Sequence, residues 1–241
     1  MLEVTLTSPP ALEPEARVLA QTYGLAYSPE PGGELVLIWT GERLELSELT
    51  TRTKPLYVDF AAGAPARRAA ARGLEPLARA AGLKGGHRPY VVDATAGLGQ
   101  DALVLAAAGC EVTLFERSPV VAALLADGLR RLAAVSELAE RLVLYHGDAA
   151  ELLRTLALPP EVVYLDPMYP QGGKSAAKRK SMRMFRELVG DDADAGALLE
   201  AALSVALKRV VVKRPLKAEP LKPKPSAQLK GRTTRFDIYL T

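Results

Sequence analysis

Acidic residues recur in this chain directly after apolar runs, or within a few residues of their ends. They are Asp93, Glu116, Asp148 and Asp166. The apolar runs are rich in β-branched and aromatic residues, as in 162–165, which is typical of buried strands. The carboxyl ends of parallel strands meet at one edge of a sheet, where α/β proteins bind nucleotides. Carboxylates at that edge would provide hydrogen-bond acceptors for the hydroxyl and amino groups of a ligand.

The segment 90–101, Tyr-Val-Val-Asp-Ala-Thr-Ala-Gly-Leu-Gly-Gln-Asp, predicts a strand, a tight loop and the start of a helix. Gly97-x-Gly99-x-x-Ala102 fits the dinucleotide fingerprint, in which glycines let the backbone approach a pyrophosphate. Asp93-x-x-x-Gly97-x-Gly99 instead resembles the first motif of methyltransferases that use S-adenosylmethionine. A carboxylate at the strand end would repel a pyrophosphate but can bind the charged amino-acid part of S-adenosylmethionine, which favours the second interpretation. An ordinary tight turn without a ligand is also compatible with the loop alone.

Glu116 and Asp148 extend the pattern to the next two strands. Glu116 ends a second apolar run, 17 residues after Gly99. An acid at such a position binds ribose hydroxyls in dehydrogenases as well as methyltransferases, so it indicates a nucleotide without choosing between them. Asp148 follows a third strand at 141–145, where it would contact an adenine amino group, cap the next helix, or do both. His146 beside it is expected to have a structural role.

The sequence Asp166-Pro167-Met168-Tyr169-Pro170 follows a fourth buried strand and indicates a reaction. It resembles the Asn/Asp-Pro-Pro-Tyr/Phe motif of enzymes that methylate exocyclic amino groups of bases. Such an amine is a poor nucleophile because its lone pair is delocalised into the ring. Acceptors on Asp166 and on the Pro167 carbonyl would bind its two N–H groups and direct the lone pair towards the methyl group. Tyr169 would stack on a base flipped out of its helix. Asp-Pro alone is also compatible with a simple turn.

Positive charge is concentrated towards the end of the chain. Residues 1–170 contain 15 lysines and arginines against 21 acidic residues, whereas residues 171–241 contain 16 against 7, so the net charge changes from −6 to +9. A basic field at one end indicates a polyanionic partner, although a solvated basic tail has the same composition. The candidates for contacts with an RNA phosphate backbone follow the catalytic loop or end a fifth strand. They are Lys174, Lys178, Arg179, Lys180, Arg183, Lys213 and Arg214.

Composition narrows the classes of protein. The chain has 241 residues, of which 49% are hydrophobic, so it is long enough for one large domain, with or without an appendage. We expect no membrane span, because no apolar run approaches ~18 residues, and no signal peptide at the start. The single Cys110 excludes an internal disulfide, favours a reducing cytoplasm and is expected to be buried. Two histidines and one cysteine provide no zinc cluster, so no metal is expected.

The secondary structure predicted around these residues divides the chain at residue 84. Residues 1–84 are expected to be a small α+β appendage and residues 85–241 a doubly wound α/β domain, because strands and helices alternate there. A strand at 235–240 is expected to close the sheet in antiparallel orientation. The elements expected in the appendage are a helix at 11–23, strands at 35–40, 43–46 and 56–60, and an arginine-bearing helix within 61–83.

Five segments are specific enough to indicate a family. They are 91–101 (VVDATAGLGQD), 115–125 (FERSPVVAALL), 162–170 (VVYLDPMYP), 209–215 (RVVVKRP) and 235–239 (RFDIY). Together they resemble the bacterial small-subunit ribosomal RNA guanine-N2 methyltransferase J family. The resemblance covers about residues 55–241 and includes Met168, and the first 50 residues have no recognised counterpart. It implies a class I methyltransferase fold: α/β, Rossmann-like, with a mostly parallel seven-stranded sheet.

The resemblance also implies an activity and a set of site residues. The activity is transfer of one methyl group from S-adenosylmethionine to N2 of a guanosine near the 3′ end of 16S ribosomal RNA, with the RNA or the 30S subunit as partner. The family's cofactor positions fall on Gln100, Asp101, Glu116, Arg117, Asp148, Ala149 and Asp166, in addition to Asp93, Ala94, Gly97 and Gly99 of the loop. The catalytic positions are Asp166, Pro167, Met168 and Tyr169. Gln100 replaces a more usual Arg, Tyr169 replaces a more usual Phe, and 171–174 replaces a more basic stretch.

Three other functions stay open at this point. A nicotinamide-dependent oxidoreductase would explain Gly97-x-Gly99-x-x-Ala102 but neither Asp93 nor the loop at 166–170. A non-catalytic RNA-binding assembly factor would explain the basic segment equally well. An N6-adenine methyltransferase would use the same chemistry at Asp166. The sequence leads to no prediction of the oligomeric state.

Overall fold

The structure is a computed structural model that describes residues 4–50, 54–61, 69, 75–168, 194–221 and 224–241. Several predicted positions lie outside the described residues. They are Tyr169, Lys174, Lys178, Arg179, Lys180 and Arg183, together with Arg67, Arg68 and Arg72 of the expected arginine-bearing helix.

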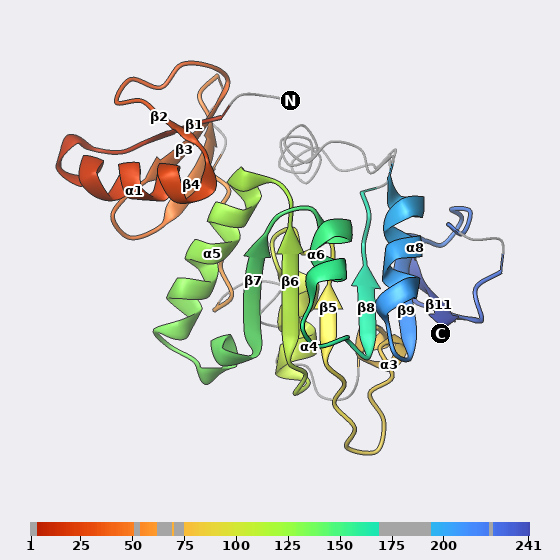
Figure 1. The fold of residues 1–241 in the computed structure, drawn as a ribbon. Helices are drawn as coiled ribbons and strands as arrows, with labels where there is room; N and C mark the ends of the chain where they lie inside the picture. Colours follow the sequence, from red (N-terminus) through yellow and green to blue (C-terminus); the bar gives the residue numbers. More distant parts are fainter. Residues whose placement is uncertain (1–3, 51–53, 62–68, 70–74, 169–193, 222–223) are drawn as a thin grey trace.

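A twisted sheet of seven strands forms the centre of the molecule (Figure 1). Its strands are β5 (Val91–Asp93), β6 (Val112–Glu116), β7 (Leu142–His146), β8 (Val162–Leu165), β9 (Arg209–Pro215), β10 (Ala227–Lys230) and β11 (Thr234–Leu240). The spatial order is β10-β11-β9-β8-β5-β6-β7, in which β11 alone runs against its neighbours. The order reverses at β5, so a crevice is expected outside the carboxyl ends of β5 and its neighbours.

Helices cover both faces of this sheet. On one face lie α3 (Pro76–Ala80), α4 (Gln100–Ala107) and α5 (Pro119–Ala133), which share a hydrophobic core with the sheet. On the other face lie α6 (Ala149–Thr155) and α8 (Ala195–Val205), which pack against a second core that includes Phe115 and Leu165. Figure 1 shows α6 and α8 in front of the sheet. Alternation of strand and helix along the chain produces this three-layer arrangement, because each crossover helix must pack back on the sheet.

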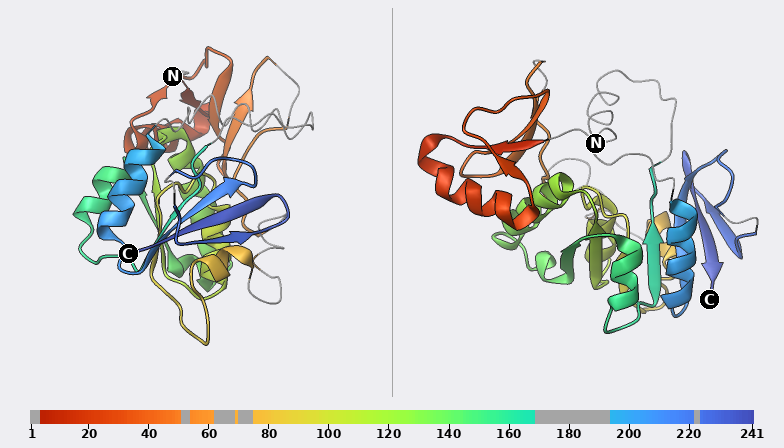
Figure 2. Two further views of the ribbon diagram at one scale, coloured as in Figure 1. Left: turned by 90° about the vertical axis from the view of Figure 1, so that its right-hand side faces the viewer. Right: turned by 45° about the horizontal axis from the view of Figure 1, so that its top comes forward.

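A smaller unit precedes the sheet in the chain and lies beside α5, far from β10 and β11 (Figure 2). It contains the four-stranded sheet β2-β1-β3-β4, with a short 3-10 helix, η1 (Pro10–Leu12), running into α1. The elements are β1 (Thr5–Thr7), α1 (Glu13–Tyr23), β2 (Ala26–Tyr27), β3 (Leu35–Trp39) and β4 (Leu44–Glu48). The predicted helix and the predicted hairpin are therefore confirmed.

Buried polar contacts join the small unit to α5. The Asp127 carboxylate accepts a hydrogen bond of 3.1 Å from the backbone N–H of Leu44 and also binds Arg130 and Arg131. Arg131 donates in turn to the carbonyl of Val58, in the connector that leads out of the small unit. The division at residue 84 stays a prediction, and α3, which precedes it, packs against α4 and β11 of the large unit.

The structure corrects one predicted strand and adds short ones. Residues 56–60 form no strand, since Leu56 makes only an isolated bridge with Leu46. The short strands β1, β2 and β10 were not predicted. The seven-stranded, mostly parallel sheet and the closing antiparallel strand β11 are confirmed.

Cys110 is buried as expected. No helix in the described part of the chain is long and apolar enough to cross a membrane.

Candidate active site

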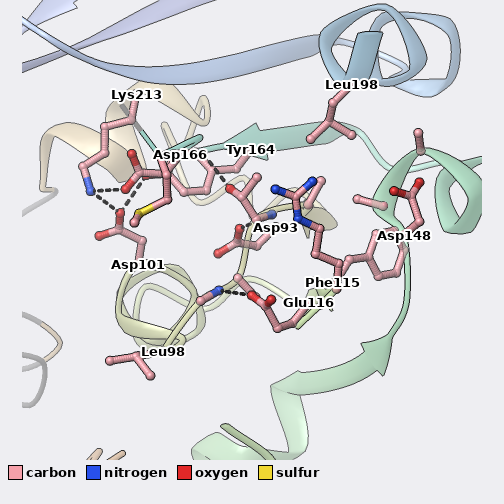
Figure 3. A pocket seen from close by; sticks show the side chains of 18 of the residues that line it. Asp93, Leu98, Asp101, Phe115, Glu116, Asp148, Tyr164, Asp166, Leu198 and Lys213 are labelled. Atoms are coloured by element: carbon pink, nitrogen blue, oxygen red, sulfur yellow. Dashed lines mark hydrogen bonds and ion pairs between the residues drawn. The ribbon is translucent and has the colours of Figure 1, made fainter. Parts of the chain in front are cut away.

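A cavity of 460 Å³ opens at the carboxyl ends of β5, β6 and β8 (Figure 3). Its size lies within the usual range of small-molecule sites. Twelve of the predicted site residues line it. They are Asp93, Ala94, Gly97, Gln100, Asp101, Glu116, Arg117, Asp148, Ala149, Asp166, Met168 and Lys213. The sheet edge therefore brings together side chains that are up to 120 residues apart in the sequence, from Asp93 to Lys213.

The loop between β5 and α4 is held in a fixed shape by its glycines and by backbone hydrogen bonds. Gly97 and Gly99 have φ angles of 53° and 70°, which other residues rarely adopt. A Cβ atom on Gly99 would lie 2.7 Å from Leu125 Cδ1 and 2.9 Å from Phe60 Cζ. The backbone N–H of Ala96 donates to the carbonyl of Phe115 on β6. Gly99 is buried behind the loop and shapes it without lining the cavity.

Glu116 fixes the same loop from β6. One carboxylate oxygen accepts a hydrogen bond of 2.9 Å from the N–H of Gly97, and the other accepts one of 2.7 Å from the N–H of Ser118. The side chain is buried at the wall of the cavity. Because a carboxylate oxygen can accept more than one hydrogen bond, this arrangement is compatible with the predicted binding of ribose hydroxyls. Glu116 thus connects the glycine loop with the start of α5.

A hydrogen-bonded network crosses the floor of the cavity between β8, α4 and β9. The Tyr164 hydroxyl donates to Oδ2 of Asp101 over 2.6 Å, and Nζ of Lys213 donates to the same oxygen over 2.7 Å. Lys213 also donates to Oδ2 of Asp166 over 2.8 Å. Figure 3 shows Lys213 between the two carboxylates. Burial raises the pKa of Tyr164 well above its usual value, with the charges of Asp101, Asp166 and Asp93 adding to this, so the hydroxyl keeps its proton and donates.

Asp93 lies at the end of β5 with only 1% of its surface exposed. Its carboxylate accepts a hydrogen bond of 3.2 Å from the N–H of Thr95. Burial raises the pKa of Asp93 well above its usual value, and the charges of Asp101 and Asp166 raise it further, whereas the Thr95 N–H and the charge of Lys213 lower it. A cationic ligand group beside Asp93 would favour its ionised form.

Asp166 and Met168 bring the catalytic motif to the same cavity. The N–H of Asp166 donates to the Thr95 hydroxyl over 2.6 Å, which ties the catalytic loop to the glycine loop. The Asp166 side chain is 38% exposed, so a ligand in the cavity can reach it. Pro167 is buried and stiffens the loop behind it. Tyr169, the predicted stacking residue, lies outside the described residues.

Asp148 and Arg117 lie at the rim. The Asp148 side chain accepts a hydrogen bond of 3.1 Å from the N–H of Glu151 and so caps α6. Capping the next helix was one of the two roles predicted for Asp148. Arg117 reaches across the opening and forms an ion pair of 3.0 Å with Asp194, next to the start of α8. Both side chains line the cavity.

The side chains of Lys213 and Arg214 are less exposed than a contact with RNA phosphates would lead one to expect. Lys213 points into the network of carboxylates, and Arg214 is only 6% exposed and donates to the carbonyl of Glu219. Strand alternation places the two side chains on opposite faces of β9. Both side chains therefore have partners within the protein, and a contact with RNA phosphates stays a prediction for these two residues.

Sequence reasoning did not single out several residues of the cavity. Thr95 and Tyr164 hydrogen bond to predicted site residues, and Phe115, Leu98 and Leu198 supply apolar surface. Tyr164 precedes Asp166 by two residues, so the strand period could have indicated that both face the same side. Leu198 could not have been found, because its place depends on how α8 packs.

The sheet order, the acid at each strand end and the glycine loop together define a class I methyltransferase that uses S-adenosylmethionine. The net charge of the Asp93, Asp101, Asp166 and Lys213 cluster is negative when all four are ionised, which suits a ligand with a sulfonium and an ammonium group. Glu116 provides acceptors for ribose hydroxyls, and Phe115 and Leu198 provide apolar surface for a purine. The residues present therefore fit this cofactor.

Known proteins agree with this class. The family model for SAM-dependent methyltransferases, SAM_MT, matches residues 18–241. A SAM-dependent methyltransferase of Neisseria gonorrhoeae, NGO1261, has a solved structure with a TM-score of 0.76 and 33% identity, covering 98% of this chain and 96% of that chain. The nicotinamide-dependent oxidoreductase interpretation is thereby excluded.

Two curated relatives are similar over almost the full length. Ribosomal RNA small subunit methyltransferase J of Thioalkalivibrio sulfidiphilus is 54% identical over 241 residues, covering 95% of this chain and 94% of that protein. The protein of the same name from Aeromonas hydrophila is 50% identical over 244 residues, covering 98% and 96%. The chain belongs to the ribosomal RNA small subunit methyltransferase J family of SAM-dependent methyltransferases.

Proposed function

We propose that this protein transfers one methyl group from S-adenosylmethionine to the exocyclic N2 of a guanosine near the 3′ end of 16S ribosomal RNA, as RNA or within the 30S subunit. The observation that carries the proposal is the position of Asp166. Its carboxylate lies at the end of β8, in the cavity whose other walls fit the cofactor, and it is accessible to a ligand. The names of the full-length relatives support ribosomal RNA of the small subunit as the substrate.

Asp166 is proposed to bind the amino group that receives the methyl. A guanine amino group has two N–H donors, and a carboxylate is a strong acceptor for them. If the two N–H groups of the guanine amino group donate to Asp166 and to the Pro167 carbonyl, the nitrogen becomes more pyramidal. Its lone pair is then available to attack the methyl group. The bound cofactor supplies an electrophilic methyl group on its sulfonium. The contact between Asp166 and Thr95 would keep the acceptor aligned with the cofactor loop.

The other predicted residues are proposed to hold the cofactor. Asp93 would bind the amino group of its methionine part, and Glu116 its ribose hydroxyls. Asp148 and Ala149 would contact the adenine, with Phe115 and Leu198 forming the apolar walls of its slot. The basic residues Lys174, Lys178, Arg179, Lys180 and Arg183 are proposed to contact RNA phosphates.

Replacement of Asp166 tests the central role. Asp166→Ala is expected to lower kcat for methylation of small-subunit RNA by about 10²-fold or more, because the acceptor for the reacting amino group is lost. Binding of S-adenosylhomocysteine, measured by calorimetry, is expected to change much less. Glu161→Gln is the matched control, because Glu161 lies at the opposite end of the same strand, in an ion pair with Lys208.

Two outcomes would contradict the proposal. Unchanged methylation by Asp166→Ala would exclude its role as acceptor. RNA binding by the unaltered protein without any methyl incorporation would instead favour a non-catalytic assembly factor.

A further inference from the structure

The strands β8 and β9 carry an acid–lysine pair at each end, and the two pairs differ in their surroundings. At the amino ends, Glu161 and Lys208 form an ion pair, and the Lys208 side chain is 52% exposed. At the carboxyl ends, Asp166 and Lys213 form an ion pair of 2.8 Å, and the Lys213 side chain is 25% exposed. A surface pair contributes little to stability, whereas a partly buried one is less screened and fixes its groups more strongly.

The inner pair belongs to a larger cluster. Nζ of Lys213 lies 2.7 Å from Oδ2 of Asp101. The same oxygen accepts a hydrogen bond from the Tyr164 hydroxyl, which fixes its position. Asp93 interacts electrostatically with Lys213 from β5, and the strand on the other side, β11, places Phe236 beside Lys213 in register. The charged or titratable groups that face Lys213 from the described elements around it are therefore Asp93, Asp101, Tyr164 and Asp166.

Lys213 offsets part of the negative charge of this cluster. Burial acts to lower the pKa of Lys213, but the charges of Asp166 and Asp101 outweigh it and raise the pKa above its usual value, so the side chain is a cation throughout the physiological range. Removal of that cation would leave three carboxyl groups close together, and close carboxylates favour protonation of one another. Protonation of Asp166 would convert one of its acceptor oxygens into a donor.

We propose that Lys213 is a positioning residue for methyl transfer, which holds the ionised Asp166 carboxylate in place by bridging it to Asp101. This inference rests on the proposed function and deepens it. Lys213 acts through Asp166 and Asp101, and it contacts neither RNA phosphates nor the methyl group. Asp101, which also accepts a hydrogen bond from the Tyr164 hydroxyl, anchors the ammonium group of Lys213. The cofactor side and the acceptor side of the cavity therefore share one cation.

The test compares Lys213→Met, which keeps length and removes charge, with Lys213→Arg, which keeps charge. Lys208→Met is the control that breaks the outer pair on the same two strands. For Lys213→Met we expect kcat to fall by about 10- to 100-fold near neutral pH, with little change in KM for RNA. The acidic limb of the plot of kcat against pH should move to higher pH, since the carboxyl groups of the cluster then stay protonated to higher pH. Lys213→Arg should recover part of kcat and the unshifted profile, and Lys208→Met should match the unaltered protein.

A second measurement, thermal unfolding, does not depend on methyl transfer. Thermal unfolding of the ligand-free protein is measured at about pH 5.5 and about pH 8.5, on either side of neutrality. At the lower pH the carboxyl groups of Lys213→Met can be protonated, whereas at the higher pH their repulsion is largest. The melting temperature should therefore fall further below that of the unaltered protein at the higher pH. Lys208→Met should show no comparable dependence.

Several results would overturn the inference. One is an unchanged kcat and pH profile in Lys213→Met, and another is a raised KM for RNA with kcat unchanged, which would indicate a phosphate contact. A loss of stability that is equal at both pH values would indicate packing alone. Failure of the unaltered protein to methylate RNA would instead refute the proposed function, and the unfolding experiment would still decide whether Lys213 balances the carboxyl cluster.

Discussion

The backbone N–H of Asp166 donates a hydrogen bond of 2.6 Å to the side-chain hydroxyl of Thr95. The two residues belong to different loops, one after β8 and one after β5, and these strands are neighbours in the sheet. The backbone N–H of Thr95 donates in turn to Asp93. Thr95 therefore fixes the position of Asp166, the proposed acceptor for the substrate, relative to Asp93, which is proposed to bind the cofactor.

Thr95→Val is expected to reduce kcat by about tenfold, because a half-buried N–H that loses its acceptor costs about 1–3 kcal/mol, and the Asp166 loop can then shift. Thr95→Ser keeps the hydroxyl and should retain most activity. Steady-state kinetics of both variants with the same RNA check the prediction. Equal rates for Thr95→Val and the unaltered protein would show that the contact does not control the position of Asp166.

Cofactor affinity is expected to depend on pH through Asp93. In the ligand-free protein the pKa of Asp93 is raised by burial and by the charges of Asp101 and Asp166, so the carboxyl holds a proton to higher pH than usual. Binding of a cationic amino group requires the ionised form. Affinity for S-adenosylhomocysteine should thus rise with pH up to the raised pKa of Asp93, and calorimetry should detect proton release below it.

The same shift has a consequence for stability with the opposite sign. Because the folded-state pKa of Asp93 lies above its unfolded value, folding takes up a proton, and this contribution to stability is lost as pH rises through the folded pKa. Asp93→Asn should remove this dependence and weaken cofactor binding most at high pH, where Asp93 of the unaltered protein is ionised. A pH-independent affinity in the unaltered protein would contradict the assignment of Asp93 to the amino group.

Gly99→Ala is expected to destabilise the fold and weaken cofactor binding. The φ angle of 70° disfavours any side chain, and the new Cβ would meet Leu125 and Phe60 at less than 3.0 Å. Gly85→Ala is the matched control, because Gly85 also has a positive φ angle of 57° but no atom within 4 Å of its Cβ position. The difference between the two free energies of unfolding should be about 1–3 kcal/mol, the usual cost of crowding a packed site. Chemical denaturation of both variants measures it, and equal losses would exclude a role for the contact with Phe60.

The strand ends of the active site were predictable from the sequence, because an apolar run followed by an acid specifies both the strand and the edge at which the acid lies. Asp93, Glu116 and Asp166 line the cavity for that reason. The short strands β1 and β2 were not predictable, since they depend on pairing with neighbouring strands, β1 with β3 and β2 with β1, rather than on a local period.

The roles of charged residues at the end of β9 were not predictable from composition. Lys213 and Arg214 are adjacent and basic, yet one faces Asp101 and Asp166 in the cavity and the other is buried on the opposite side. Which way each points depends on the register of β9 against β8, a property of the folded sheet. Charge counting treats both residues alike, and only the strand geometry separates them.

The most direct measurement is the identity of the methylated nucleoside. Small subunits from a strain that lacks this gene would be incubated with the protein and S-adenosylmethionine labelled in its methyl group, and the RNA would then be digested to nucleosides. We expect label in N2-methylguanosine from the 3′ region of 16S ribosomal RNA. Label in N6-methyladenosine would keep the chemistry of Asp166 but contradict the substrate, and no label in subunits or free RNA would contradict the proposed activity.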